Sequence, residues 1–309
     1  MTAKVILNPY AGRWLGLAKK ELIEISLREA GIDFELELTE KAGHATELAA
    51  AAVEGGYSPI IAAGGDGSIN EVINGMVSCA KNQDVISLPS LGVIPLGTAN
   101  DLVVNLGMPT DISSAAKVIA TGKTRTIDLG KVIFGNEKIC RYFGNNSAIG
   151  MEPTVTLIQE EELIRMRGVV RYLVATLMAI SRNPHWNLHL EWEGGWYEGS
   201  ATLVTVGNNP LTGGLFYMTP HADPNDGLLT FVYGYLPTRS KILSVLPKTM
   251  KSGKGSYVEH PAIHEIHTAW LKIHTDTPTP LHTDGVIQSK AVTDVEYRVV
   301  PNKLSILTP

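Results

Sequence analysis

Two short glycine-bearing segments contain the residues of this chain that are best suited to bind phosphate. Residues 60–71 read IIAAGGDGSINE, an apolar run followed by Gly64, Gly65 and Gly67 around Asp66. Glycine lacks a Cβ, so backbone N–H groups in such a turn approach an anion closely, and the positive end of a following helix adds attraction. Asp66 would repel a bare phosphate. The turn therefore predicts a cation beside the phosphate, and Mg²⁺ is the usual companion of ATP.

A second turn repeats this arrangement after the next predicted strand. Residues 94–101 read IPLGTAND and offer the Thr98 hydroxyl and the Asp101 carboxylate. Helix capping competes as an interpretation, because Ser68 with Glu71 and Thr98 with Asp101 have the spacing of capping boxes. Capping does not require three glycines around an aspartate, and independent caps have no reason to converge at one sheet edge. We therefore expect both turns to bind the same phosphate-bearing ligand.

The elements that must position these turns alternate between strands and helices up to about residue 122. Short apolar runs predict strands and helix-period stretches predict helices, which is typical of βαβ units and a parallel sheet. The glycine turns follow their strands at the carboxyl ends, where open α/β sheets place ligands. The predicted strands are 4–7, 34–38, 59–63 and 92–94, and the predicted helices are 18–30, 45–54, 68–77, 99–105 and 113–121.

The second half of the chain has a different pattern, with longer β-rich runs joined by Gly, Asn or Asp turns, which predicts an antiparallel sheet domain. One long helix is predicted over 154–181 and another over 239–251. We expect two domains, residues 1–124 as a nucleotide-binding α/β domain and residues 125–309 as a β-rich domain. The predicted strands of the second half are 126–134, 138–145, 187–192, 201–206, 228–233, 269–275 and 295–300.

Composition excludes several classes of protein. The chain has 309 residues, 44% of them hydrophobic, and a formal net charge of -5, which argues against a broad basic surface for nucleic acid. Its apolar runs are shorter than the ~20 residues that span a bilayer. Cys79 and Cys140 lie far apart in the sequence and predict neither a disulfide framework nor a metal site. A cytoplasmic protein is expected.

Taken together, the turns resemble those of the diacylglycerol kinase catalytic family. The resemblance is carried by Asn8 to Gly12, by GGDGSINE at 64–71 and by PLGTAND at 95–101. It extends over nearly the whole chain and is closest to bacterial lipid kinases, which are related to sphingosine and ceramide kinases. It implies an N-terminal α/β domain like those of NAD kinases and phosphofructokinases, a C-terminal β-sandwich-like domain, and ATP between them.

The resemblance also implies roles for individual residues. Asp66, Asp101 and Asp128 would belong to an acidic network around the catalytic Mg²⁺. A structural Mg²⁺ loop is implied within residues 220–229, whereas a plain Asn-Asp-Gly turn explains the same residues without a metal. The loop's ligands would be the Asp226 carboxylate and the carbonyl groups of Asp223 and Leu228. The implied nucleotide-binding residues are Asn8, Thr39, Gly64, Gly65, Asp66, Gly67, Ser68, Asn70 and Thr98.

The sequence departs from the family at one chemically important place. Family members carry Asp-Gly-Glu near the C-terminus, and the glutamate is commonly assigned as the proton acceptor. Here residues 284–286 are Asp-Gly-Val, and Val286 cannot move a proton. Asp284 is therefore the predicted base, because a carboxylate within reach of a hydroxyl can accept its proton during phosphoryl transfer. A different substrate or low activity are the alternatives.

The sequence as a whole predicts a kinase that uses ATP and Mg²⁺ to phosphorylate a lipid hydroxyl, with a diacylglycerol-like or sphingoid acceptor. Such a protein would contact the membrane surface peripherally. Two other functions are open: a kinase of a soluble hydroxyl compound, and a nucleotide-binding regulatory protein with little catalysis. No nucleic acid partner is expected, and a homodimer is left open.

Overall fold

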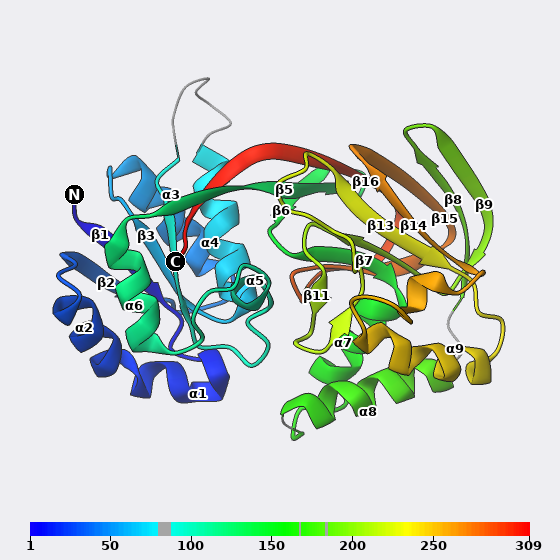
Figure 1. Ribbon diagram of the computed structural model, residues 1–309, viewed down its shortest axis with the longest axis horizontal. Helices are drawn as coiled ribbons and strands as arrows, with labels where there is room; N and C mark the ends of the chain where they lie inside the picture. Colours follow the sequence, from blue (N-terminus) through cyan, green and yellow to red (C-terminus); the bar gives the residue numbers. More distant parts are fainter. Residues whose placement is uncertain (80–87, 167, 183–184) are drawn as a thin grey trace. The chain divides into compact units, whose positions relative to one another are not determined.

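The computed structural model describes residues 1–79, 88–166, 168–182 and 185–309 (Figure 1). Contacts divide the chain into two compact units, residues 1–127 with 302–309, and residues 128–301. The chain therefore returns to the first unit at its C-terminal end. The division predicted from the sequence, 1–124 and 125–309, assigned no C-terminal residues to the first unit.

The first unit is a parallel sheet covered by helices on both faces. Its strands are ordered β4-β3-β1-β2, and the end of β16 (Val286–Leu307) lies parallel to β4 where Ile306 pairs with Leu91. The predicted βαβ organisation is confirmed. The elements are β1 (Ala3–Leu7), α1 (Ala11–Ala18), α2 (Lys20–Glu29), β2 (Phe34–Leu38), α3 (His44–Glu54), β3 (Ile60–Gly64), α4 (Asp66–Cys79), β4 (Leu91–Pro95), α5 (Asp101–Asn105) and α6 (Ile112–Thr121).

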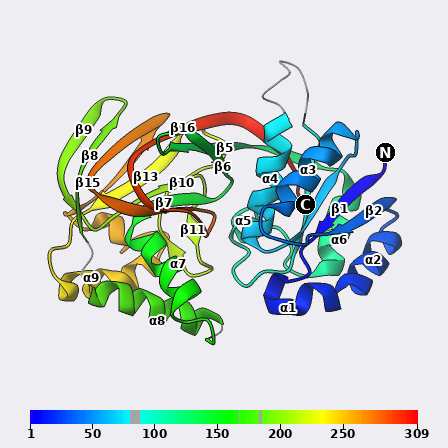
Figure 2. The ribbon, with the colours of Figure 1, turned by 180° about the vertical axis from the view of Figure 1, so that it is seen from behind.

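Side chains along each strand point alternately to the two faces of the sheet, and those on one face form part of the core of this unit. Val5, Ile61 and Ile94 are fully buried on one face of the sheet, where Ile23 of α2 and Ile119 of α6 pack against them. Helices α3 and α4 pack together on the opposite face, as Figure 2 shows from behind. Strands β1, β3 and β4 are buried on both sides and read as nearly continuous apolar runs, whereas the edge strand β2 alternates apolar and acidic residues.

The second unit is built on antiparallel strands ordered β14-β13-β10-β7-β15-β16, with β8 pairing with β15 and β9 pairing with β8. Strand β5 (Thr124–Phe134) enters this unit and pairs with β6. The predicted antiparallel sheet is confirmed. The other strands are β6 (Ile139–Phe143), β7 (Asn146–Gly150), β8 (Trp186–Trp192), β9 (Gly195–Ala201), β10 (Leu203–Gly207), β11 (Leu211–Thr212), β12 (Phe216–Tyr217), β13 (Leu229–Gly234), β14 (Ile263–Thr268), β15 (Trp270–Thr283) and β16 (Val286–Leu307).

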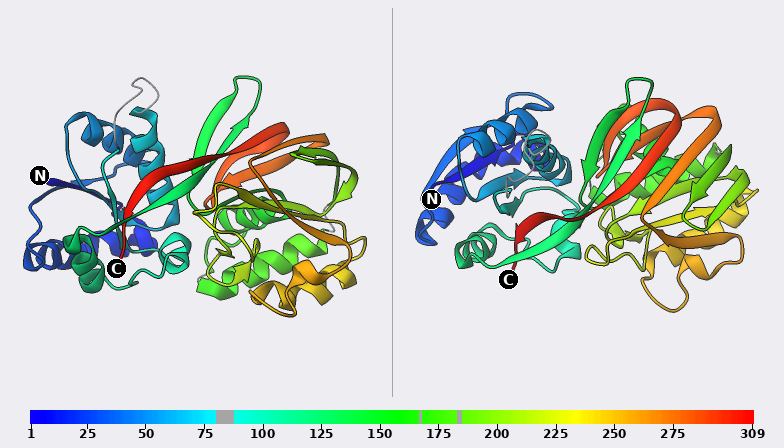
Figure 3. Two further views of the ribbon diagram at one scale, coloured as in Figure 1. Left: turned by 45° about the horizontal axis from the view of Figure 1, so that its top comes forward. Right: turned by 90° about the horizontal axis from the view of Figure 1, so that it is seen from above.

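The helices of the second unit lie on one side of its strands, where the left view of Figure 3 shows residues 151–161 and 168–181 in green and 239–250 in gold. The single long helix predicted over 154–181 is wrong, because two helices occupy this stretch. Three consecutive glutamates, residues 160–162, stand at the C-terminal end of the first helix, where its dipole disfavours negative charge. The helices are α7 (Met151–Glu161), α8 (Gly168–Ser181) and α9 (Arg239–Val245), followed by the 3₁₀ turns η2 (Leu246–Met250) and η3 (Tyr257–Glu259).

Candidate active site

The two glycine turns lie side by side at the carboxyl edge of the sheet in the first unit. Gly64 is opposite Pro95 in the register of β3 and β4, and the backbone N–H of Leu96 donates to the Gly64 carbonyl at 2.8 Å. A Cβ added to Gly97 would lie 2.7 Å from the Cα of Gly65. Real Cβ atoms do not approach that closely, so only residues without a side chain allow these two backbones to touch.

The turn after the first strand joins the same edge. The Asn8 side chain donates from Nδ2 to the Ser68 hydroxyl at 2.8 Å, and its Oδ1 accepts from the backbone N–H of Tyr10 at 2.9 Å. Gly12 has a φ of 60°, and a Cβ there would lie 2.8 Å from the Leu96 carbonyl oxygen. Three strand ends that are far apart in the sequence therefore meet, as the order of a parallel sheet requires.

Asn100 holds the second turn and was not assigned a role from the sequence. Its Oδ1 accepts from the backbone N–H of Gly97 at 2.9 Å, and its Nδ2 donates to the Gly97 carbonyl at 3.3 Å. Its φ of 52° is left-handed, which asparagine tolerates better than most residues. The capping-box interpretation of Thr98 with Asp101 is wrong, because Asn100 is the N-cap and the helix α5 begins at Asp101.

Glu71 also has a different role from the one its spacing indicated. Helix α4 begins at Asp66, so Ser68 already lies within the helix. The Glu71 carboxylate accepts hydrogen bonds from the backbone N–H groups of Gly43 at 2.9 Å and Ala45 at 3.2 Å. The capping-box interpretation of Ser68 with Glu71 is therefore wrong. Glu71 instead satisfies the start of α3 and ties the loop after β2 to the helix that follows the first glycine turn.

The remaining predicted nucleotide-binding residues also lie in the first unit. Thr39 is buried at the end of β2, where its backbone N–H donates to the Leu7 carbonyl at 2.9 Å. Asn70 is buried, and its Oδ1 accepts from the Asn74 side chain at 3.2 Å. The other predicted residues differ in exposure: Asp66 and Gly67 are half-buried, Asp101 is buried, and Thr98 is exposed.

Asp128 and the predicted structural Mg²⁺ loop belong to the second unit. The buried Asp128 carboxylate accepts from the backbone N–H of Gly227 at 2.8 Å, so it holds this loop directly. Asp223 accepts from the backbone N–H of Asn225 at 3.0 Å, and Asp226 accepts from that of Leu228 at 2.9 Å. These are ordinary turn bonds of Asp side chains. The metal-binding role of the loop stays a prediction.

Asp284 forms the turn between the last two strands of the second unit. Asp284 and Gly285 have φ values of 45° and 77°, and Asp-Gly is a preferred pair for such a hairpin turn. The Asp284 carboxylate is 9% exposed and accepts from the backbone N–H groups of residues 144, 145 and 146, each at 2.9 Å. The structure thus assigns Asp284 a structural role that the sequence did not reveal, and its role as a base stays a prediction.

Comparison with known proteins decides the family. The diacylglycerol kinase catalytic domain matches residues 2–132, and the YegS C-terminal NAD kinase beta sandwich-like domain matches residues 147–308. Relatives named diacylglycerol kinase from Staphylococcus saprophyticus and Staphylococcus aureus are 31% identical over 283 and 285 residues. Both alignments cover 92% of this chain, with 88% of the first relative and 85% of the second. This chain belongs to the diacylglycerol kinase family.

A solved structure supports the fold of this family member over its full length. The crystal structure of a diacylglycerol kinase from Bacillus anthracis matches with a TM-score of 0.74 at 23% identity, covering 100% of this chain and 97% of the other. The expected combination of an α/β domain and a β-sandwich-like domain is confirmed. The recognition of the family from its three turns is confirmed as well.

The carboxylates at the two glycine turns of this diacylglycerol kinase family member would need further ligands to hold a metal ion. In the described parts of the chain, no cluster of three or more His, Cys, Asp or Glu side chains is arranged to hold a metal ion. In nucleotide sites, Mg²⁺ usually takes one or two carboxylates and completes its shell with phosphate oxygens and water. Asp66 and Asp101, hard-oxygen ligands at the starts of α4 and α5, fit that chemistry. They do not fit a metal held by protein alone.

Proposed function

We propose that this protein transfers the γ-phosphoryl group of ATP to the hydroxyl of a lipid, either diacylglycerol-like or sphingoid. The observation that supports this most is the backbone contact between Gly65 and Gly97, where an added Cβ would lie 2.7 Å from the neighbouring Cα. Turns without side chains at their contact let an anion approach the backbone closely, and the N-terminus of the helix that follows the first turn adds the positive end of its dipole. Family membership makes a nucleotide phosphate the natural anion.

The chemistry of each proposed residue suits a specific role in phosphoryl transfer. ATP supplies the phosphoryl group, and Mg²⁺ offsets the charge of the phosphates. The turn residues 64–68 bind phosphate oxygens, and the exposed Thr98 adds a hydroxyl donor. Asp66 and Asp101 provide carboxylate oxygens for the cation, and Asp284 accepts the proton of the lipid hydroxyl. Phosphoryl transfer depends mainly on positioning and charge stabilisation, so these tasks suffice without a covalent intermediate.

The test is transfer of labelled phosphate from ATP to a panel containing diacylglycerol, a sphingoid base and soluble polyols. We expect label in a lipid and dependence on Mg²⁺. If label appears only in a soluble compound, the acceptor is that soluble compound and not a lipid. Tight ATP binding with no transfer to any acceptor would support the nucleotide-binding regulatory protein instead.

Peripheral membrane contact is part of this proposal, and helices α1 and α2 supply the surface for it. No helix in the parts of the chain that the structure describes is long and apolar enough to cross a membrane. Large apolar side chains are nevertheless exposed on these two helices, and residues 9–29 contain four basic and three acidic residues in a chain of net charge -5. Trp, Leu and basic residues together suit an anionic bilayer surface. The exposed fractions are 73% for Trp14, 54% for Leu15 and Leu17, 50% for Leu22 and 43% for Ile25.

Replacing Trp14 and Leu17 with serine is expected to lower binding to vesicles of anionic phosphatidylglycerol by at least about tenfold, because two large apolar groups lose their bilayer contact. Cosedimentation with the vesicles measures the bound fraction. Trp196→Ser is the matched control, because Trp196 is 68% exposed but lies on β9 of the second unit. Equal vesicle binding by the double variant and the wild type would rule out this surface.

A further inference from the structure

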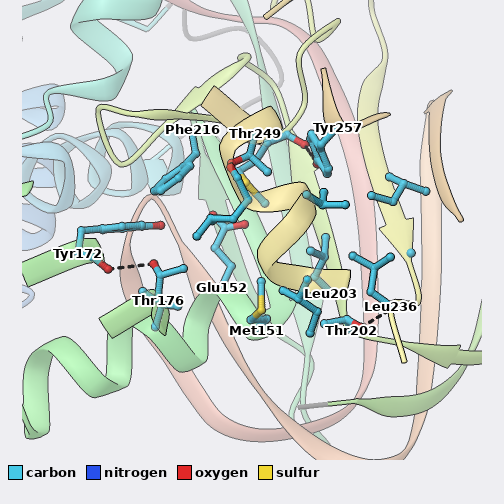
Figure 4. Close-up of a pocket in the computed structure, with 17 residues that line it drawn as sticks. Met151, Glu152, Tyr172, Thr176, Thr202, Leu203, Phe216, Leu236, Thr249 and Tyr257 are labelled. Atoms are coloured by element: carbon cyan, nitrogen blue, oxygen red, sulfur yellow. Dashed lines mark hydrogen bonds between the residues drawn. The ribbon is translucent and has the colours of Figure 1, made fainter. Parts of the chain in front are cut away.

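The second unit buries a carboxylate and a histidine that the proposed reaction does not use. Glu152, in the first turn of α7, is 6% exposed and stands among the apolar side chains of a pocket (Figure 4). No other described residue of that pocket wall carries a charge. His282 of β15 is 2% exposed, and its Nε2 lies 3.4 Å from Glu152 Oε1. Burying such a pair costs desolvation energy that apolar residues avoid, so stability alone does not account for it.

A hydrogen bond connects His282 to the turn of residues 284 and 285, which joins β15 to β16. The backbone N–H of Gly285 donates to His282 Nδ1 at 3.3 Å. The pairing of β15 with β16 shifts in register between Leu281 and His282, and bulges of this kind change the direction of a side chain. His282 therefore accepts a hydrogen bond from the turn, although it belongs to the strand that leads into it.

This hydrogen bond determines which nitrogen of His282 carries the proton. Nδ1 accepts from Gly285, so in the neutral ring the proton is on Nε2. Nε2 has no hydrogen-bond partner among the described residues, and Glu152 Oε1 lies 3.4 Å from it. That distance is longer than a hydrogen bond, but a carboxylate attracts an N–H dipole strongly in a buried site of low dielectric constant. Glu152 therefore favours the form of His282 whose Nδ1 accepts from Gly285.

Asn146 connects the same carboxylate to the other residue of the turn. Its side chain donates from Nδ2 to Glu152 Oε1 at 2.6 Å. Its backbone N–H donates to Asp284 Oδ1 at 2.9 Å, and its carbonyl accepts from the backbone N–H of Asp284 at 2.8 Å. Both residues of the turn are therefore connected to one buried carboxylate, the first through Asn146 and the second through His282.

We propose that Glu152 and His282 are positioning residues that hold the Asp284 carboxylate in place for phosphoryl transfer. The catalytic part of this proposal rests on the proposed function, in which Asp284 accepts the proton of the acceptor hydroxyl. The hold on the turn itself does not depend on that function. Neither residue contacts a substrate in this role. Displacing a reacting group by about 1 Å lowers turnover by up to about 10²-fold, so a looser turn should be visible in the kinetics.

Two substitutions of His282 separate the roles of its two nitrogens. His282→Asn keeps an accepting oxygen near the position of Nδ1, whereas His282→Gln places its amide near the position of Nε2 and leaves the Gly285 N–H without an acceptor. Hydrogen exchange of the Gly285 amide, followed by NMR without nucleotide or acceptor, measures the hold directly. We expect exchange at least about tenfold faster in His282→Gln than in the wild type, and slower in His282→Asn than in His282→Gln. Turnover per folded molecule should fall about 10–100-fold in His282→Gln, with the KM for ATP unchanged.

Glu152→Gln tests the carboxylate by a change that a purely structural role would tolerate. The amide keeps an oxygen that accepts from Asn146 and removes the buried charge, so thermal stability should not fall. The charge no longer favours a proton on Nε2 of His282, so exchange of the Gly285 amide should be faster than in the wild type and turnover lower. General structural damage would lower stability together with turnover.

His189→Gln is the matched control, because His189 and Glu198 form an exposed pair at 3.9 Å on β8 and β9 of the same unit. It should change neither exchange at Gly285 nor turnover. Wild-type exchange at Gly285 in both His282→Gln and Glu152→Gln would overturn the hold on the turn. Faster exchange with unchanged turnover would overturn the catalytic part of the proposal. Faster exchange in the variants, with a wild type that transfers phosphate to no acceptor, would overturn the proposed function and leave the hold on the turn standing.

Discussion

Replacing Asp66 with alanine is expected to abolish phosphate transfer and leave the fold nearly intact. Asp66 is half-buried at the start of α4, directly after the glycine turn whose backbone contacts Gly97. A carboxylate that holds the cation beside the phosphates acts where charge develops, and removing one such group typically costs about 10²–10³-fold in turnover. Its contribution to stability at a helix N-terminus is only about 0.3–1 kcal/mol. Steady-state transfer and thermal unfolding measure the two effects separately.

Asp111→Ala is the matched control for this prediction. Asp111 is also an aspartate at a helix N-terminus of the first unit, where its carboxylate accepts from the backbone N–H of Ser114 at 2.9 Å. Losing this cap should lower the free energy of unfolding by about 1 kcal/mol and leave turnover unchanged. Full activity in Asp66→Ala would refute the proposed role of Asp66 in binding the cation.

Asp284→Asn is expected to lower both transfer and stability. The carboxylate accepts three backbone N–H bonds from residues 144–146, and an amide replaces one accepting oxygen with a donating NH₂ group. At least one buried N–H would then face a donor, at a cost of about 1–3 kcal/mol. If Asp284 is also the base, turnover falls much further than the loss of folded protein explains. Thermal unfolding gives the folded fraction, and turnover is then expressed per folded molecule.

Nucleotide affinity separates the two roles of Asp284. A missing base lowers turnover without weakening ATP binding, because binding precedes proton transfer. Asp294→Asn serves as the control, since Asp294 is exposed on β16 of the same unit and pairs with His274 at 2.8 Å. Unchanged turnover per folded Asp284→Asn molecule would show that another group accepts the proton. Asp284 would then be a structural residue of the hairpin.

Much of the first unit could be predicted from local pattern. The apolar pattern predicted β1 to β4 to within a residue or two, because the buried strands β1, β3 and β4 are apolar along their length and the edge strand β2 alternates with period two. The glycines at 64, 65 and 97 marked the ends of these strands, since only residues without a Cβ allow the close contact found there. Helix α1 was missed, because Gly12 and Gly16 weaken its helical signal.

Strands of the second unit that depend on pairing with distant strands were harder to predict from the sequence. The strand β7 was missed altogether, although it lies between β10 and β15. Its sequence, NSAIG, contains little β-branched or aromatic character. Long-range pairing, and not local propensity, makes it a strand. The same limitation applies to the helix at 154–181, whose apolar period continues across the break between α7 and α8.

Residue types and their order along the chain sufficed for the family, the alternation of elements and the position of the glycine turns. These features depend on backbone stereochemistry and on apolar patterns that repeat every few residues. Both are determined by residues that are neighbours in the sequence. The partners of Glu71, Asn100 and Asp284 were decided only by tertiary structure, as was the placement of Glu152 in an apolar pocket. A carboxylate's role depends on which donors fold against it, and spacing in the sequence does not specify those donors.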